Sequence, residues 1–332
     1  MSLNVQGWLK SLFALSLTGL SLVSATALAE TPASGFPSKP VTITVPYPAG
    51  GATDLLARGI AQKLSEKWKR PVVIENKPGG GSLIGSEAVA RATPDGYHLL
   101  LTITTLVQAP HLRTQKPFDP TLAFEPIVEV ARTPLIMVVH PDVGAKTPDD
   151  LVKLARANPG KFNYGTYGNG TSAHFYGYIF NKQTGLEMAH VAYKGEAPSV
   201  NDLLGGQIPV VIMSGVGAAA NIQAGKMRGL AVTGPSRAPI FPDIPTFKEL
   251  GYTGMADIGW FGMFAPAGTP KPIIDKISKD VNEALTDSGL KERMGKMGLE
   301  LTGSTPQAFA KDVKQDYKKW GDVVEEIGIK LD

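Results

Sequence analysis

The chain has 332 residues, no cysteine, and a formal net charge of +3 from 33 Lys and Arg and 30 Asp and Glu. So small a charge gives no support for a nucleic-acid or anionic-membrane partner. The absence of cysteine excludes disulfides, thiolate nucleophiles, zinc–thiolate sites and a cysteine-linked lipid.

The N-terminal residues have the composition of a secretory signal peptide. A segment whose one charge is Lys10 precedes the apolar run SLFALSLTGLSLV, and Ala27-Leu28-Ala29 fits the small-x-small cleavage pattern. The run is too short to span a bilayer, which needs about 20 residues. We expect cleavage after Ala29, which removes residues 1–29 and leaves 303 of the 332 residues. The destination we expect is the periplasm of a Gram-negative cell.

After the signal peptide, strand-like and helix-like segments alternate, which predicts an α/β fold with parallel sheets. The expected strands are 41–45, 71–76, 97–103, 133–140, 161–167, 188–193, 208–214 and 228–233. The expected helices are 54–67, 83–91, 147–158, 173–183, 197–204, a short alanine-rich helix that ends at 224–225, and then 269–285, 288–296 and 305–327.

Two extended apolar segments, near 132–140 and 258–265, are the plausible crossings between two compact α/β units. Two crossings make the first unit discontinuous, because the C-terminal helices then return to it. We expect a first lobe of residues 36–134 plus 262–332 and a second lobe of residues 135–261.

Three glycine-rich turns, PAGGATD, GNGTSAH and SGVGAAA, each lead from a strand into a helix. Backbone N–H groups at such a helix start can meet a negative charge. A mononucleotide loop needs Lys and then Ser or Thr after its last glycine, but Gly51 is followed by Ala52-Thr53-Asp54. Residues 168–173 and 215–220 match a degenerate dinucleotide motif, but the strand after the second match ends at Val232-Thr233-Gly234 without the required acid.

Catalytic and metal-binding motifs are missing from the sequence. It has no G-x-S-x-G elbow and no H-E-x-x-H, and its histidines, at 98, 111, 140, 174 and 190, lack metal-ligand spacing. We therefore expect no catalytic residue, no metal and no cofactor, with an exported enzyme kept as the less favoured alternative.

A carboxylate suits these loops best, because hydroxyls, backbone N–H groups and bridging waters can satisfy it without Lys or Arg. The first loop offers Thr53, and the hydroxyl and amide groups of the second are Thr166, Asn169, Thr171 and Ser172. Thr104 and Thr105 add hydroxyls if strand 97–103 runs parallel to strand 41–45. Arg58, Lys194 and Arg237 are the cations that could reach the ligand.

Five motifs, in order, resemble the Bug-type solute-binding proteins of tripartite tricarboxylate transporters. They are PYPAGGATDLLAR, PVVIENKPGGGSLIGSEAVARATPDGY, NYGTYGNGTSAH, VAYKGEAPSVNDLLGGQI and FGMFAPAGTP, and the resemblance runs from about Phe36 to the end. It implies a monomeric periplasmic binding protein of the type II-like fold, with two α/β lobes and a ligand cleft between them. The implied ligand is a small mono-, di- or tricarboxylate, aliphatic or aromatic, which membrane permease subunits receive. Presentation of the ligand to a sensor kinase is the alternative.

The resemblance also implies the ligand-binding residues. Carried over by position, they are Tyr47, Gly50, Gly51, Thr53 and Asp54 in the first loop, Thr166, Asn169, Gly170, Thr171, Ser172 and His174 in the facing loop, and Ser214 after strand 208–214. Ser214 stands where the family commonly has Asp or Asn, so recognition of a ligand amine at this position has no support. Asp54 on the first turn of its helix is expected to act structurally as well.

Overall fold

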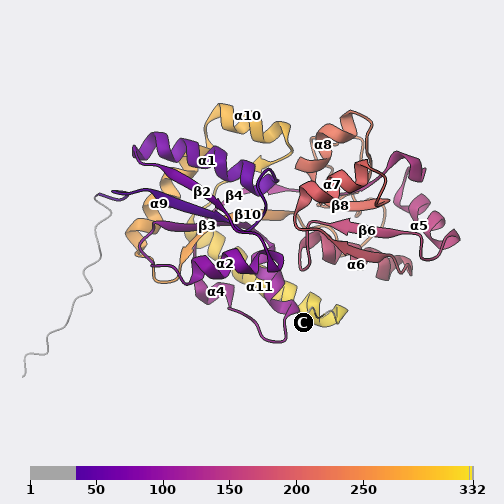
Figure 1. The fold of residues 1–332 in the computed structure, drawn as a ribbon, viewed down its shortest axis with the longest axis horizontal. Helices are drawn as coiled ribbons and strands as arrows, with labels where there is room; N and C mark the ends of the chain where they lie inside the picture. Colours follow the sequence, from indigo (N-terminus) through magenta and orange to yellow (C-terminus); the bar gives the residue numbers. More distant parts are fainter. Residues whose placement is uncertain (1–34, 329, 331–332) are drawn as a thin grey trace, which may run out of the picture. The chain divides into compact units, whose positions relative to one another are not determined.

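The computed structural model describes residues 35–328 and 330, so the predicted signal peptide and its cleavage site lie outside the described residues. The described residues contain two sheets, each flanked by helices (Figure 1). Two sheets, each flanked by helices, agree with the α/β architecture expected from the sequence. None of the helices in this part of the chain is both long and apolar enough to cross a membrane.

The first sheet has six strands in the order β11-β4-β10-β3-β1-β2. They are β1 (Val41–Val45), β2 (Val72–Asn76), β3 (His98–Ile103), β4 (Phe124–Thr133), β10 (Gly259–Pro266) and β11 (Glu300–Leu301). The flanking helices are α1 (Ala52–Trp68), α2 (Leu83–Ala90), α3 (Thr105–Gln108), α4 (Pro120–Ala123), α9 (Lys271–Leu285), α10 (Ser288–Lys296) and α11 (Pro306–Ile327). In Figure 1, α1 and α10 lie on one side of this sheet, and α2, α4 and α11 lie on the other.

The second sheet has five strands in the order β7-β6-β8-β5-β9. They are β5 (Leu135–Val139), β6 (Asn163–Thr166), β7 (Ala189–Ala192), β8 (Val210–Ser214) and β9 (Arg228–Val232). Its helices are α5 (Pro148–Ala157), α6 (Ser172–Thr184), α7 (Glu196–Leu204) and α8 (Gly215–Gln223). α5 begins with a capping box, in which Thr147 and Asp150 are bonded reciprocally.

The prediction of parallel sheets is wrong in part. β1 runs parallel to β2 and β3, and β6 runs parallel to β7 and β8, but β10 is antiparallel to β3 and β4. β5 is likewise antiparallel to β8 and β9. The antiparallel strands β5 and β10 include most of the two segments predicted as crossings. A segment that connects two sheets can itself be a hydrogen-bonded strand of one of them.

The long strand β4 was not predicted. Its sequence, FEPIVEVART, interrupts the apolar residues with Pro126 and two acids, which obscures the strand pattern. The fold satisfies the buried acid, since Glu129 accepts hydrogen bonds from Arg132 at 2.7 and 2.8 Å. Pairing with β10 along almost the whole of its length then fixes β4 as a strand.

Candidate functional site

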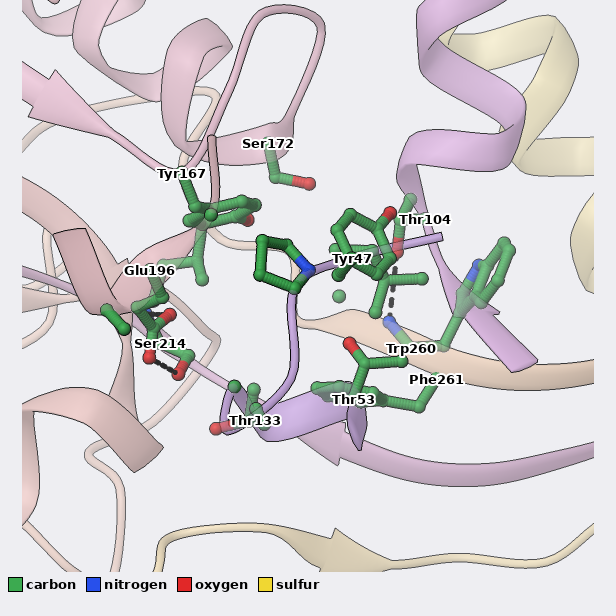
Figure 2. Close-up of a pocket in the computed structure, with 18 of the residues that line it drawn as sticks. Tyr47, Thr53, Thr104, Thr133, Tyr167, Ser172, Glu196, Ser214, Trp260 and Phe261 are labelled. Atoms are coloured by element: carbon green, nitrogen blue, oxygen red, sulfur yellow. Dashed lines mark hydrogen bonds between the residues drawn. The ribbon is translucent and has the colours of Figure 1, made fainter. Parts of the chain in front are cut away.

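One pocket, with about 700 Å³ of empty space including its open mouth, is lined by residues from elements of both sheets. It lies beside the carboxyl ends of the parallel strands, where ligands of open α/β sheets bind (Figure 2). Elements of the first sheet contribute Tyr47, Pro48, Ala49, Gly51, Ala52, Thr53, Ile103, Thr104, Thr133, Gly259, Trp260 and Phe261. Elements of the second sheet contribute Leu135, Tyr167, Ser172, Gly195, Glu196, Ala197 and Ser214.

The N-terminus of α1 borders this pocket and has no side-chain cap. Its N-cap is Gly51, in extended conformation, and the preceding Gly50 adopts φ +86°, in the left-handed region that favours glycine. The first N–H groups of a helix have no partner within the helix, and they carry the positive end of its dipole. This 17-residue helix therefore presents an anion-binding end at the pocket.

Asp54 stabilises the loop before α1 through a hydrogen bond from Gly50, and it does not line the pocket. Its carboxylate accepts hydrogen bonds from the Gly50 N–H at 2.9 Å, from Arg58 Nε at 2.9 Å and from Asn76 Nδ2 at 3.0 Å. Burial raises the pKa of Asp54, but these three hydrogen bonds outweigh burial and leave the pKa lowered. The expected structural role of Asp54 agrees with this geometry, and Arg58 is engaged there instead of facing the pocket.

The GNGTS loop, by contrast, uses most of its polar groups internally. Thr171 caps α6 by accepting from the His174 N–H at 3.3 Å, and its hydroxyl donates to the Gly168 carbonyl at 2.8 Å. The Gly170 N–H donates to His174 Nδ1 at 3.3 Å. Ser172 borders the pocket, and its hydroxyl bonds to the Gln108 amide at 2.9 and 3.2 Å.

Three rings, two of them buried and that of His190 half-buried, stack beside this loop. The His174 and His190 rings lie 4.0 Å apart and nearly parallel, and Tyr164 also stacks on His190, at 5.1 Å. His190 Nε2 lies 2.7 Å from the Thr166 hydroxyl. Burial lowers the pKa of His174 to about 4, and burial with the neighbouring His174 lowers that of His190 to about 3. Both rings are therefore neutral at pH 7.

Glu196 is the one acid that lines the pocket, and it has no ion-pair partner among the described residues. It is the first residue of α7, whose N-cap, Gly195, also lacks a side-chain cap. The carboxylate accepts from the Ser214 hydroxyl at 2.7 Å and from the Ser214 N–H at 2.9 Å, so it lies at the start of α8. Burial raises the pKa of Glu196, and the hydrogen bonds from Ser214 oppose that rise.

A model of the tripartite tricarboxylate transporter family receptor matches residues 56–329. The chain belongs to this receptor family. The resemblance seen in the sequence is thereby confirmed, and the receptor is a solute-binding protein of a periplasmic family and not an enzyme.

Two curated relatives match almost the full length of this receptor. A protein encoded in the tcbD–tcbE intergenic region of Pseudomonas sp. strain P51 is 34% identical over 93% of each chain. BugT of Bordetella pertussis is 32% identical over 96% of this receptor and 98% of BugT.

Three solved structures share the fold. The periplasmic binding protein BugD is 35% identical, with a TM-score of 0.85 over 89% of this receptor and 99% of BugD. An R. palustris protein with adipate is 31% identical, with a TM-score of 0.84 over 89% and 99% of the two chains. MatC from Rhodopseudomonas palustris, with bound malate, is 27% identical, with a TM-score of 0.83 over 87% and 100%.

The predicted ligand-binding residues of the receptor divide into three groups by position. Those that border the pocket are Tyr47, Gly51, Thr53, Thr104, Ser172 and Ser214. Asn169 and Thr171 border an adjoining outer groove, which also contains Lys194. Those that border neither are Gly50, Asp54, Thr105, Thr166, Gly170 and His174.

Tyr47 follows β1, and Thr104 and Thr105 follow β3. The two strands are parallel, which is the condition under which the threonines were predicted to lie near the first loop. The Thr104 hydroxyl accepts from the Trp260 N–H at 3.0 Å, and the Thr105 hydroxyl is buried beside the Tyr47 phenol. The Tyr47 hydroxyl lies 3.5 Å from that of Thr102. Burial is the main cause that raises the pKa of Tyr47, so its phenol is neutral at pH 7.

Sequence reasoning missed several pocket residues, above all Glu196, Tyr167 and Trp260. Tyr167 and Glu196 lie in two of the quoted family motifs but were not singled out there, and the fold brings the three residues together from distant segments. One usable signal was present: Gly195-Glu196 follows a short strand and opens a helix, as the other glycine turns do. Arg237, a predicted candidate cation, pairs with Glu249 at 2.8 Å and does not line the pocket.

Acid should destabilise the receptor through His174 and His190, whose pKa values are lowered. Both folded-state pKa values lie below 6.5, so the unfolded chain takes up protons that the folded chain excludes. The free energy of unfolding is then highest above pH 6.5 and falls as the pH drops toward 4. At pH 5 the loss is about 2 kcal/mol per histidine. Urea unfolding at pH 8 and pH 5 measures the loss, which should shrink in His174→Gln. The same substitution at the exposed His98 is the control, and an equal pH dependence in both variants would contradict this prediction.

Proposed function

We propose that this receptor captures a small organic carboxylate in the pocket and delivers it to the membrane permease subunits of a tripartite tricarboxylate-type transporter. The observation that carries the proposal is the uncapped N-terminus of α1 at the pocket. Two structural neighbours support the ligand class, since their structures contain adipate and malate. The proposed setting is the periplasm, after cleavage behind Ala29, with the receptor acting as a monomer.

The chemistry of the pocket favours a carboxylate held by neutral groups. No Lys, Arg or His lines it among the described residues, so the favourable field comes from the start of α1. Thr53, Thr104 and Ser172 add hydroxyl groups, and bridging waters can complete the shell of the ligand. A micromolar ligand needs about −8 kcal/mol, which is within reach of roughly ten heavy atoms.

Closure of two lobes is the proposed mechanism of signalling to the permease. We place the lobes at residues 36–134 plus 262–332 and 135–261. Their loops touch beside the pocket, where Gly195 lies against the Pro48 ring and Gly81 lies against the Asn169 carbonyl. A ligand that contacts both lobes binds this closed form better than an open form and shifts the population toward it. The permease then recognises the closed form.

A thermal-shift screen of the protein from Glu30 onward tests the ligand class. The screen compares mono-, di- and tricarboxylic acids, aliphatic and aromatic, with the amides of the same acids. We expect a saturable rise in melting temperature with some acids and none with their amides, because the amide removes the negative charge. Rises of equal size for the acids and the amides would overturn the carboxylate site. Mass spectrometry of the denatured protein shows whether a ligand from expression already occupies the pocket.

A further inference from the structure

The end of the pocket that Glu196 and Ser214 form is negatively charged, in contrast to the α1 end. In Figure 2, Glu196 and Ser214 lie on the side opposite Thr53 and Thr104. The two acids nearest the site differ in their partners. Asp54 pairs with Arg58 at 2.9 Å, whereas the donors to Glu196 are all neutral: the hydroxyl and N–H of Ser214 and the N–H of Gly217. Glu196 therefore has no cation partner among the described residues, and only the neutral donors at the start of α8 offset its charge.

Glu196 also occupies the helix end that a second ligand carboxylate would need. Its carboxylate sits at the start of α8, where it bonds the N–H and the hydroxyl of the N-cap residue, Ser214. Gly217 makes room for it, because a Cβ atom there would lie 2.2 Å from Glu196 Oε1. The protein thus supplies its own anion to α8, and a ligand carboxylate placed there would meet a like charge.

The carboxylate retains capacity for a ligand donor. Two oxygens offer about four acceptor positions, of which Ser214 fills two and the Gly217 N–H a third, so about one remains. The ring of Tyr167 borders the same end of the pocket, and its pKa lies well above the ordinary value because of burial and the negative charge of Glu196. A carboxylate beside an aromatic ring, with no competing cation, is an environment that binds an ammonium group.

Building on the proposed function, we infer that the ligand carries an ammonium group as well as a carboxylate, and that Glu196 recognises the ammonium group. The ligand then spans the pocket from the positive end of α1 to Glu196, and it connects elements of the first sheet to elements of the second. Glu196 is the specificity-determining residue, and it supplies the amine recognition that Ser214 alone cannot.

The test uses pairs of acids that differ in the ammonium group alone: aspartate with succinate, and 4-aminobutyrate with butyrate. Glutarate replaces the ammonium group of 4-aminobutyrate with a second carboxylate. Isothermal titration calorimetry measures Kd for each acid with the unaltered receptor, with Glu196→Gln and with Glu196→Asp. Glu196→Gln retains an acceptor for Ser214 but removes the charge, while Glu196→Asp retains the charge.

With the unaltered receptor, the ammonium-bearing acid of at least one pair should bind about tenfold or more tightly than its partner. Glu196→Gln should bring that ratio close to one and strengthen succinate or glutarate, whereas Glu196→Asp should keep the preference. Melting temperatures of the unliganded variants report their folding. If Glu196→Gln does not fold, Gly217→Ala is the second variant, because its Cβ atom displaces the Glu196 carboxylate. Gly217→Ala should then lose the preference for the ammonium-bearing acid.

Two failures are distinguishable. Binding of succinate, butyrate or glutarate as tightly as the ammonium-bearing acids, or an unchanged ratio in Glu196→Gln, overturns the role of Glu196 and leaves the carboxylate site standing. Binding of none of these acids, together with a thermal-shift screen in which acids and amides behave alike, overturns both the role of Glu196 and the carboxylate site.

Discussion

Replacing Ala52 with proline is expected to weaken carboxylate binding by about tenfold or more while the receptor remains folded. Ala52 is the first residue of α1 and lines the pocket. Proline at this position removes one N–H donor and places ring carbons where the ligand would accept a hydrogen bond. A hydrogen bond to a charged group contributes about 1.5–3 kcal/mol, which corresponds to roughly tenfold to 150-fold in Kd.

The backbone around Ala52 already suits proline. The first helical position tolerates proline because its N–H has no partner within the helix. The preceding residue, Gly51, has φ −81° and ψ 171°, the extended conformation that a residue before proline prefers. The loss of affinity therefore reports on the anion site and not on a broken helix.

Ser288→Pro is the matched control. Ser288 is exposed and is the first residue of α10, behind the N-cap Asp287 at φ −58° and ψ 125°. Calorimetric titration of an acid identified by thermal shift measures Kd for both variants, and urea unfolding measures their stability. Equal affinity in Ala52→Pro and Ser288→Pro would show that the carboxylate does not bind at the start of α1.

The sequence was sufficient to predict the elements that local pattern determines. The turn PAGGATD and the strand before it were predicted as a strand that leads into an anion-binding helix start, and the structure has β1 and an uncapped α1 there. Strand β4 could not be predicted in this way. Glu129 is neutralised by Arg132 of the same strand, but the pairing that fixes β4 is with β10, which lies more than 120 residues further along the chain.

The GNGTS loop shows a different limit of prediction from sequence. Thr171 and Ser172 are adjacent and of the same chemical type, yet Thr171 caps its helix while Ser172 borders the pocket. Hydroxyl side chains serve both purposes, because a helix N-terminus and a ligand carboxylate offer equivalent hydrogen-bond partners. Sequence alone cannot separate a residue that holds a loop from one that holds a ligand. Glu196 was missed for the opposite reason. Only the folded protein shows that it lines a pocket, because the other lining residues are far from it in the sequence.

Replacing Gly81 with alanine is expected to weaken ligand binding by about tenfold or more through its effect on closure. A Cβ atom at Gly81 would lie 2.5 Å from the Asn169 carbonyl oxygen, across the contact between the loops of the two lobes. Such overpacking costs about 1–3 kcal/mol, and here the cost falls on the closed form alone. The smaller closed population lowers the apparent affinity by the same factor.

Gly80→Ala separates this effect from backbone strain. Gly80 and Gly81 have similar left-handed φ angles, +59° and +65°, so alanine strains the two positions about equally. A Cβ atom at Gly80 meets only Ile84 and Leu83 of its own segment, at 3.5 and 3.6 Å. Both variants should therefore lose similar stability toward urea, but only Gly81→Ala should lose affinity. Equal Kd values in the two variants would mean that ligand binding does not require the contact between Gly81 and Asn169.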